Sequence, residues 1–308
     1  RQMCIRDSFH LAGGNRNALM LYQWLAVHLD KLYLHVGEHR FALPPLVTFI
    51  GFDPDEALLP SPGEQLDGYR VLQEFFCFPE RFHGFRIDGL QHVWPDEAAT
   101  HVQLEFRFNA PLPPDLRVDR TTVLLNCVPA INLFSRLADP IALNGQTVSE
   151  LIRLSRQDGA QDEIFSVDRV SSLHQKSHRL VQDFKPFEAL DSRFPLAEPT
   201  PPRYYKLDIE QEPVNDKVQH RVSLVQRNLT PYLAQQERLS IELTCSNGTR
   251  AQQLKVGDVD VTTQDTPSFV TYRNLTRPSR CYPPMLQSGG YGDRHWALIS
   301  NLSLNNLS

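Results

Sequence analysis

The feature that most constrains the fold of this 308-residue chain is a series of short runs in its second half that alternate polar and apolar residues. Alternation of this kind places every second side chain on one face of a strand and is typical of half-buried β-sheets. We therefore expect the region after residue 135 to be mainly antiparallel β structure. The predicted strands cover residues 163–170, 204–212, 221–228, 239–247 and 256–263.

The first half of the chain mixes helical and strand patterns. Apolar residues spaced three and four apart predict helices near residues 15–34 and 66–77, although the pattern from Leu29 onward fits a strand as well as a helix. The strand patterns of this half lie at 85–90, at 101–110 and, as a continuous apolar run typical of a buried strand, at 121–128. The predicted fold class is α+β and β-rich.

Changes in pattern also predict how the chain is divided. Residues 1–8 share no pattern with the rest of the chain and resemble a translated adapter, so we interpret them as a non-native leader. An α+β region is expected over 9–135 and a mainly β region over 136–308. Within the latter, residues 171–202 lack a clear period, which predicts a long surface loop. The abrupt ends suggest a fragment of a longer chain.

Composition argues against several classes of function. The net charge of −5 disfavours broad, non-specific nucleic-acid binding. No apolar run approaches the roughly 20 residues that a membrane-spanning helix needs. The five cysteines are odd in number and form no CxxC motif, which argues against a disulfide framework or a zinc site and favours a reducing compartment.

The stretch GYRVLQEFFCFPERFHGF, residues 68–85, combines rings and carboxylates in a way that can signal an active site. Glu74 and Glu80 lie on either side of a predicted helix end, so the sequence does not predict that they converge. Arg70, four residues before Glu74, and Arg81, beside Glu80, favour local ion pairs instead. The rings expected to supply buried area are Phe75, Phe76, Phe78 and Phe82.

Other candidate sites are weaker. The pairs His35/His39 and His174/His178 are each four residues apart, a spacing that can hold a metal on a helix. Neither pair has the HExxH order, so loop histidines in solvent are the ordinary interpretation. The glycine-rich segment 287–294 lacks the phosphate-loop pattern. No catalytic, cofactor-binding or metal-binding residue is predicted.

Four stretches resemble, in the same order, the signature segments of the TssF (ImpG, VasA) family of type VI secretion baseplate subunits. They lie at 68–90, 129–145, 163–170 and 275–308 and together span nearly all of residues 9–308. Asp168 and Arg169 in the third stretch could pair with residues on adjacent strands. The matching positions to which we assign a structural role are Tyr69, Gln73, Glu74, Phe78, Pro79, Phe82, Asn132, Phe134, Asp139, Pro140, Asp168 and Arg169.

The resemblance implies a structural, non-enzymatic role without cofactors. TssF proteins are baseplate wedge components that assemble with TssG and dock to TssK around the spike to prime assembly of the contractile sheath. The implied partners are TssG, TssK, other baseplate subunits, the VgrG spike and a second TssF copy, with no nucleic acid and no direct membrane insertion. The implied location is cytoplasmic, at the baseplate docked on the inner membrane.

The residues alone leave two other classes open. A β-rich carbohydrate- or peptide-binding module would hold aromatic side chains with a polar rim in a concave pocket. A hydrolase would need Glu74 and a second acid within about 5–9 Å in an open cleft. A structural subunit would instead expose apolar and aromatic patches that its partners bury.

Overall fold

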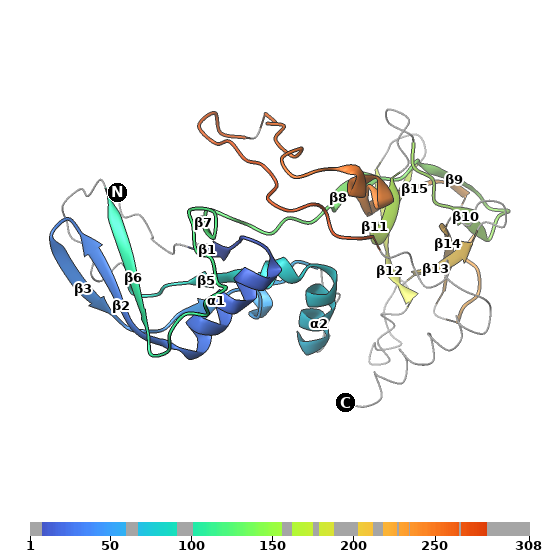
Figure 1. Cartoon of the computed structure of the whole chain (residues 1–308). Coiled ribbons are helices and arrows are strands. Elements are labelled where there is room, and N and C mark those ends of the chain that lie inside the picture. Colours follow the sequence, from blue (N-terminus) through green and yellow to red (C-terminus); the bar gives the residue numbers. More distant parts are fainter. Residues whose placement is uncertain are drawn as a thin grey trace. The chain divides into compact units, whose positions relative to one another are not determined.

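A computed structural model describes residues 8–59, 67–90, 101–155, 162–174, 179–187, 203–211, 218–226, 228–233, 235–264 and 266–281. The chain divides into two compact units, Arg1–Ile131 and Asn132–Ser308. Nearly all strand pairs are antiparallel in both units (Figure 1). The predicted α+β, β-rich fold class is confirmed.

The N-terminal unit begins with strand β1 (Ser8–Leu11) and helix α1 (Asn15–Val27). Three side chains on one face of α1 are buried: Ala18, Leu21 and Leu25. The prediction of a helix near 15–34 is wrong beyond Val27, because Leu29–Val36 forms strand β2. Alternate β2 residues are buried, so the period of two decides the conformation there. Ser8, the last residue of the predicted leader, belongs to β1, and residues 1–7 lie outside the described residues.

Two antiparallel sheets form this unit, one in the order β4-β5-β1-β7 and one in the order β3-β2-β6 (Figure 1). Between β4 and β5 the chain forms the 3-10 helix η1 (Pro54–Glu56), helix α2 (Asp67–Cys77) and the 3-10 helix η2 (Pro79–His83). Helix α2 agrees with the prediction for 66–77. The remaining strands are β3 (His39–Leu43), β4 (Thr48–Phe49), β5 (Gly84–Arg86), β6 (Val102–Phe108) and β7 (Val123–Leu125).

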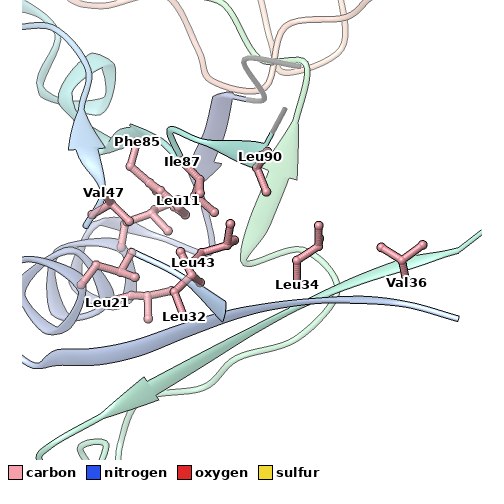
Figure 2. Close-up of a cluster of buried hydrophobic side chains, with 12 residues drawn as sticks. Leu11, Leu21, Leu32, Leu34, Val36, Leu43, Val47, Phe85, Ile87 and Leu90 are labelled. Carbon is pink, nitrogen blue, oxygen red and sulfur yellow. The ribbon is translucent and has the colours of Figure 1, made fainter. Parts of the chain in front are cut away.

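One apolar core joins α1 to both sheets. Figure 2 shows Leu21 of α1, Leu11 of β1 and Leu32 of β2 directed into the same cluster as Phe85 of β5. Leu104, Phe106 and Phe108 of β6 pack against it from one face, as their alternation predicted. The expected buried strand at 121–128 is wrong, since only β7 pairs there and Leu125 and Val128 are exposed.

The C-terminal unit is built around an eight-stranded sheet in the order β10-β14-β13-β12-β11-β15-β8, with β9 also paired to β15. Its β12–β13 pair is parallel, and its other pairs are antiparallel. The core side chains of its centre include Val170, Ile241, Leu243 and Cys245. The strands are β8 (Phe134–Leu137), β9 (Ile141–Asn144), β10 (Ser149–Leu151), β11 (Glu163–His174), β12 (Leu180–Pro186), β13 (Tyr204–Gln211), β14 (Val218–Val225) and β15 (Gln235–Ser246).

Two predictions for this unit are wrong. The loop expected over 171–202 contains the end of β11 and all of β12, while 175–178 and 188–202 lie outside the described residues. The strand expected at 256–263 is irregular chain. Four strands agree with their predicted runs to within a few residues: β11, β13, β14 and β15.

Candidate functional site: a buried charge network and exposed contact surfaces

Glu74 of α2 is the most buried carboxylate of the signature stretch, at 2% exposure. Its Oε1 accepts hydrogen bonds from the backbone N–H groups of Leu58 and Leu59, at 2.9 and 3.0 Å. Its Oε2 is 3.1 Å from an Arg70 guanidinium nitrogen and also pairs with Arg81. The carboxylate is therefore shared between a loop, its own helix and η2.

Glu56 of η1 extends this arrangement. Its backbone carbonyl accepts a hydrogen bond from Arg81, and its carboxylate accepts from the Gly51 N–H at 2.6 Å and pairs with Arg86 of β5 at 2.5 Å. We call these five charged residues, Arg70, Glu74, Arg81, Glu56 and Arg86, the Glu74 network. It ties η1, α2, η2 and β5 together, because each charge is bonded to a group on another element.

Local sequence explains one of the three ion pairs of the network. The i,i+4 spacing of Arg70 and Glu74 on one helical face predicts their pair, and the structure contains it. Sequence reasoning paired Arg81 with the adjacent Glu80, whereas Arg81 binds Glu74. Pro79 stands at the first position of η2 and ends α2 two residues earlier, which turns the chain so that Arg81 points back to the helix. Glu56 carries no sequence signal for this role.

The charges of the Glu74 network stabilise contacts between elements of the fold. Burial lowers the pKa of Arg81, and the nearby Arg70 charge lowers it further. Glu74 is enclosed and both of its oxygens are engaged, so it lacks the open cleft that a catalytic carboxylate needs. The described surroundings of Glu74 thus differ from the open cleft that the hydrolase interpretation requires.

The rings of the signature stretch divide between core and surface. Phe82 is 4% exposed and lies in contact with Phe75 and Phe52, with ring centroids 5.9 and 5.2 Å away. A Cβ on Gly51, which has φ +107°, would lie 2.8 Å from the Phe82 ring. The expectation that Phe76 supplies buried area is wrong, since it is 74% exposed.

An apolar face of α2 points to solvent. The residues three and four apart on it are Tyr69, Leu72, Phe75 and Phe76, and each is more than two-fifths exposed. We call these four residues the α2 aromatic face. Large exposed rings side by side on a helix are uncommon on monomeric proteins and mark contact sites.

The second matching stretch sets the path of the chain past β15. Strands β8 and β9 both pair with β15, one on each side of the segment Asp139–Pro140. The Asp139 carboxylate turns away and accepts a hydrogen bond from the Ser155 N–H at 3.0 Å. Pro140 has no N–H to donate to a ladder. These two residues interrupt pairing so that one segment covers both halves of β15.

The third stretch forms cross-strand contacts on β11. Arg169 pairs with Asp183 of β12 at 2.9 Å and with Glu242 of β15 at 3.5 Å. Asp168 accepts a hydrogen bond from the Thr244 hydroxyl at 2.7 Å. The prediction that Asp168 and Arg169 pair across adjacent strands is confirmed.

The side chains of the remaining matching positions are not members of the Glu74 network, although the Phe78 backbone bonds the backbones of Glu74 and Arg81. Gln73 is exposed on α2, and Phe78 is half-buried at the start of η2. Asn132 is exposed before β8, and Phe134 packs against the core of the C-terminal unit. The twelve positions thus mark several packing contacts and do not converge on one site.

The structure separates the first histidine pair and describes only one member of the second. His35 lies on β2 and bonds Glu105 at 2.7 Å, while His39 lies on β3 beside Phe41. His174 ends β11, and His178 and the glycine-rich segment 287–294 lie outside the described residues. Across the described part of the chain there is no group of three or more potential metal ligands. Burial raises the pKa of the Cys245 thiol to about 11, which opposes nucleophilic chemistry there.

A long irregular segment after η4 (Gly248–Gln253) also exposes apolar side chains. We call residues 254–281 the arm; it forms the long orange excursion in Figure 1. Asn274 fastens its base, because its side chain accepts from the Gly257 and Val259 N–H groups at 2.9 and 3.0 Å. Phe269, in the middle of this sequence range, is 87% exposed.

A small hollow lies within the described part of the C-terminal unit. It is bordered by Leu143, Val222 and Tyr232 and has a volume of about 10 Å³. That volume holds one water molecule and is too small for a sugar ring. In the described residues no helix is both long and apolar enough to span a membrane.

The fold and these features define a class of β-rich protein with a buried charge network and exposed apolar faces. The family model for "Type VI secretion system, TssF" matches residues 6–308. The chain therefore belongs to the TssF family.

Two individual proteins show the same relationship. The chain is 30% identical to type VI secretion system component TssF1 of Pseudomonas aeruginosa, over 97% of this chain and 50% of that protein. It also matches a chain of the TssK-TssF-TssG baseplate subcomplex of the type VI secretion system, solved by cryo-electron microscopy, with a TM-score of 0.79 and 29% identity. That match covers 97% of this chain and 54% of the solved chain, so the chain spans about half the length of the relatives it matches.

Proposed function

We propose that this chain is part of a structural baseplate wedge subunit of a type VI secretion system and has no catalytic activity. The observation that carries the proposal is the match over 97% of the chain to a solved chain of a TssK-TssF-TssG baseplate subcomplex. The α2 aromatic face and the exposed apolar side chains of the arm support it, because an assembly subunit needs surfaces that partners cover. The engaged state of Glu74 is consistent with the same role.

The proposed partners follow from the same relationship. In our proposal the protein assembles with TssG and docks to TssK around the VgrG spike, contacts a second copy of itself, and so primes assembly of the contractile sheath. Its location in this proposal is the cytoplasm, at the baseplate docked on the inner membrane. No cofactor takes part, and nucleic acid is not a partner.

The α2 aromatic face is the part of this chain that we propose to contact another baseplate subunit. Exposed Tyr, Leu and Phe side chains at helical spacing can insert into a groove on a partner. Aromatic residues of this kind often carry a large share of binding energy. Buried contacts of Glu74 with the Leu58–Leu59 backbone and Arg81, and of Phe75 with Phe82, anchor the helix to neighbouring elements, which lowers the entropic cost of docking.

The experiment that tests the proposal is co-expression of the full-length chain with the TssG and TssK subunits of its own secretion system, followed by affinity purification. We expect a stable complex. The variant Leu72→Asp should weaken the complex about tenfold or more, because it places a charge on the α2 aromatic face. Leu19→Asp is the matched control, since Leu19 is an equally exposed leucine on α1 (51% against 54%).

The outcomes separate the two parts of the proposal. If the wild-type chain forms no complex with either subunit, the baseplate function is wrong. If the complex forms and both leucine variants bind as well as the wild type, the function stands and the assignment of the α2 aromatic face is wrong.

A further inference from the structure

The outer face of the three-stranded sheet in the N-terminal unit carries an excess of positive charge. One face of β2 and β6 is buried through Leu32, Leu34 and Leu104. The opposite face, which we call the basic face, carries the uncharged Ala42 and Gln103 together with Lys31, Tyr33, His35, Arg40, Glu105 and Arg107. It has three permanent cations and one carboxylate, in a chain whose net charge is −5.

Glu105 lies at the centre of the basic face. Its carboxylate accepts from Arg107 Nε at 2.5 Å, from Arg40 at 3.3 Å and contacts His35 Nε2 at 2.7 Å. A single carboxylate cannot neutralise all of these groups together with Lys31. The nearest acidic residues on β2 and its turn, Asp30 and Glu38, occupy a bulge and a turn at the two ends of the strand.

Tyr33 holds the two guanidinium groups in place. The Arg40 Cζ lies 3.6 Å from the centre of the Tyr33 ring, and the Arg107 Cζ lies 5.5 Å from it. Stacking on a ring orients a guanidinium while leaving its N–H edge available for a carboxylate. Arg107 uses only its Nε toward Glu105, and its terminal nitrogens bond no residue that the structure describes. More than half of its side chain is exposed.

The larger sheet in the C-terminal unit shows that this excess is not a general property of the surface. There Arg169 is shared by two carboxylates, Asp183 and Glu242. Its charge is satisfied within the fold. On the basic face the ratio is reversed, because one described carboxylate faces three permanent cations, and this excess favours binding of an anionic group.

We infer that the basic face is a docking surface for a carboxylate-rich segment of a partner protein. Prearranged Arg and Tyr side chains are the groups that protein interfaces prefer, and complementary charge selects an acidic partner. This inference rests on the proposed assembly function and concerns a different surface from the α2 aromatic face. The sheet is rigid and its opposite side is core, so docking needs no rearrangement of the backbone.

Carbodiimide cross-linking of the complex with TssG and TssK tests the inference directly, because this reagent joins an amine to a carboxylate that touches it. We expect Lys31 to be linked to an Asp or Glu residue of another subunit, identified by mass spectrometry. Lys206 is the internal control, since its ammonium lies 2.6 Å from Asp208 of the same strand and should give a link within the chain. If the complex forms and the Lys206 link is found, but Lys31 has no link to another subunit, the inference is wrong.

Charge reversal gives an independent measurement. The double variant Arg40→Glu, Arg107→Glu should bind its partner roughly tenfold to a hundredfold more weakly and lose most of its dependence on salt. Arg120→Glu is the control, because Arg120 is exposed and forms no ion pair with the described residues. Lys31→Glu is a second basic-face variant, because Lys31 also forms no ion pair with the described residues and can be replaced without disturbing the fold. Unchanged binding in both basic-face variants would overturn the inference.

Two further probes separate an acidic protein from other anions. The wild-type chain is sedimented with vesicles of phosphatidylglycerol and phosphatidylcholine, and titrated with duplex DNA. We expect neither to displace the protein partner. Displacement by vesicles or by DNA that depends on Arg40 and Arg107 would assign the face to a lipid surface or to nucleic acid and so overturn the inference. A failure of the wild-type complex itself would instead count against the proposed function.

Discussion

Two carboxylates of the N-terminal unit, Glu74 and Glu105, each contact several cationic side chains but differ in burial and in role. Glu74 is buried, bonds two backbone N–H groups and joins elements of the fold. Glu105 lies at the surface, and hydrogen bonds from His35 and Arg107 lower its pKa to about 2. The same residue types thus make a structural joint in one place and a contact surface in the other. Burial decides between them, because solvent screens the exposed cluster and not the enclosed one.

The largest effect that this comparison predicts is for Glu74→Gln. The change leaves Arg70 and Arg81 buried without their shared anion, which should lower the free energy of unfolding by about 3–5 kcal/mol. Urea denaturation of the full-length chain measures it. Glu105→Gln is the control and should change the stability far less. Equal losses in the two variants would contradict the distinction between the two clusters.

The rings of the signature stretch give a second pair. Phe82→Ala should cost about 3–4 kcal/mol of stability, because it opens a cavity among Phe75, Phe52 and the backbone at Gly51. Phe76→Ala should alter stability by less than about 0.5 kcal/mol, since that ring lies in solvent. Thermal unfolding compares them. A large loss for Phe76→Ala would show that α2 packs differently from the structure described.

Gly51 allows a sharper test of the packing around Phe82. We expect Gly51→Ala to destabilise the fold by about 1–3 kcal/mol, because alanine is strained at φ +107° and its Cβ would meet the ring at 2.8 Å. Gly89→Ala is the matched control, because Gly89 also has a φ beyond the left-handed helical region, +88°, and has open space around its Cβ. The difference between their denaturation midpoints isolates the contact with Phe82, and an equal loss would exclude it.

The smallest effect concerns pH. Burial lowers the pKa of His83 below its ordinary value of 6.5, and burial together with His83 lowers that of His10, whose ring stacks beside it. These histidines therefore bind protons more readily in the unfolded chain. Their contribution to the free energy of unfolding is fully present above about pH 6.5 and is lost as the pH falls below that value. Denaturation midpoints at about pH 7.5 and 5.5 measure the slope. His83→Gln should flatten it, and an unchanged slope would rule out His83 as its source.

How much of this molecule could be predicted differs between its elements. Periodicity identified β11, β13, β14, β15 and α2, since their apolar spacing is long and regular enough to show which face is buried. The prediction failed at Leu29–Val36, where the spacing of apolar residues fits both a helix and a strand. It also failed at 121–128, where an apolar run proved to be largely exposed. An apolar run does not say whether the fold or a partner covers it.

Three features could be predicted from the amino-acid sequence alone: the α+β, β-rich class, the Arg70–Glu74 pair and the colinear segments that carry the family resemblance. Each depends on residues that lie close together along the chain. Tertiary structure decided that Arg81 binds Glu74, that Phe82 is buried while Phe76 is exposed, and that Lys31, Arg40 and Arg107 share one face. These facts depend on how β5, α2, η1 and the β3-β2-β6 sheet meet in space. Spacing along a chain fixes neighbours within one helix or strand, and only packing brings distant charges and rings together.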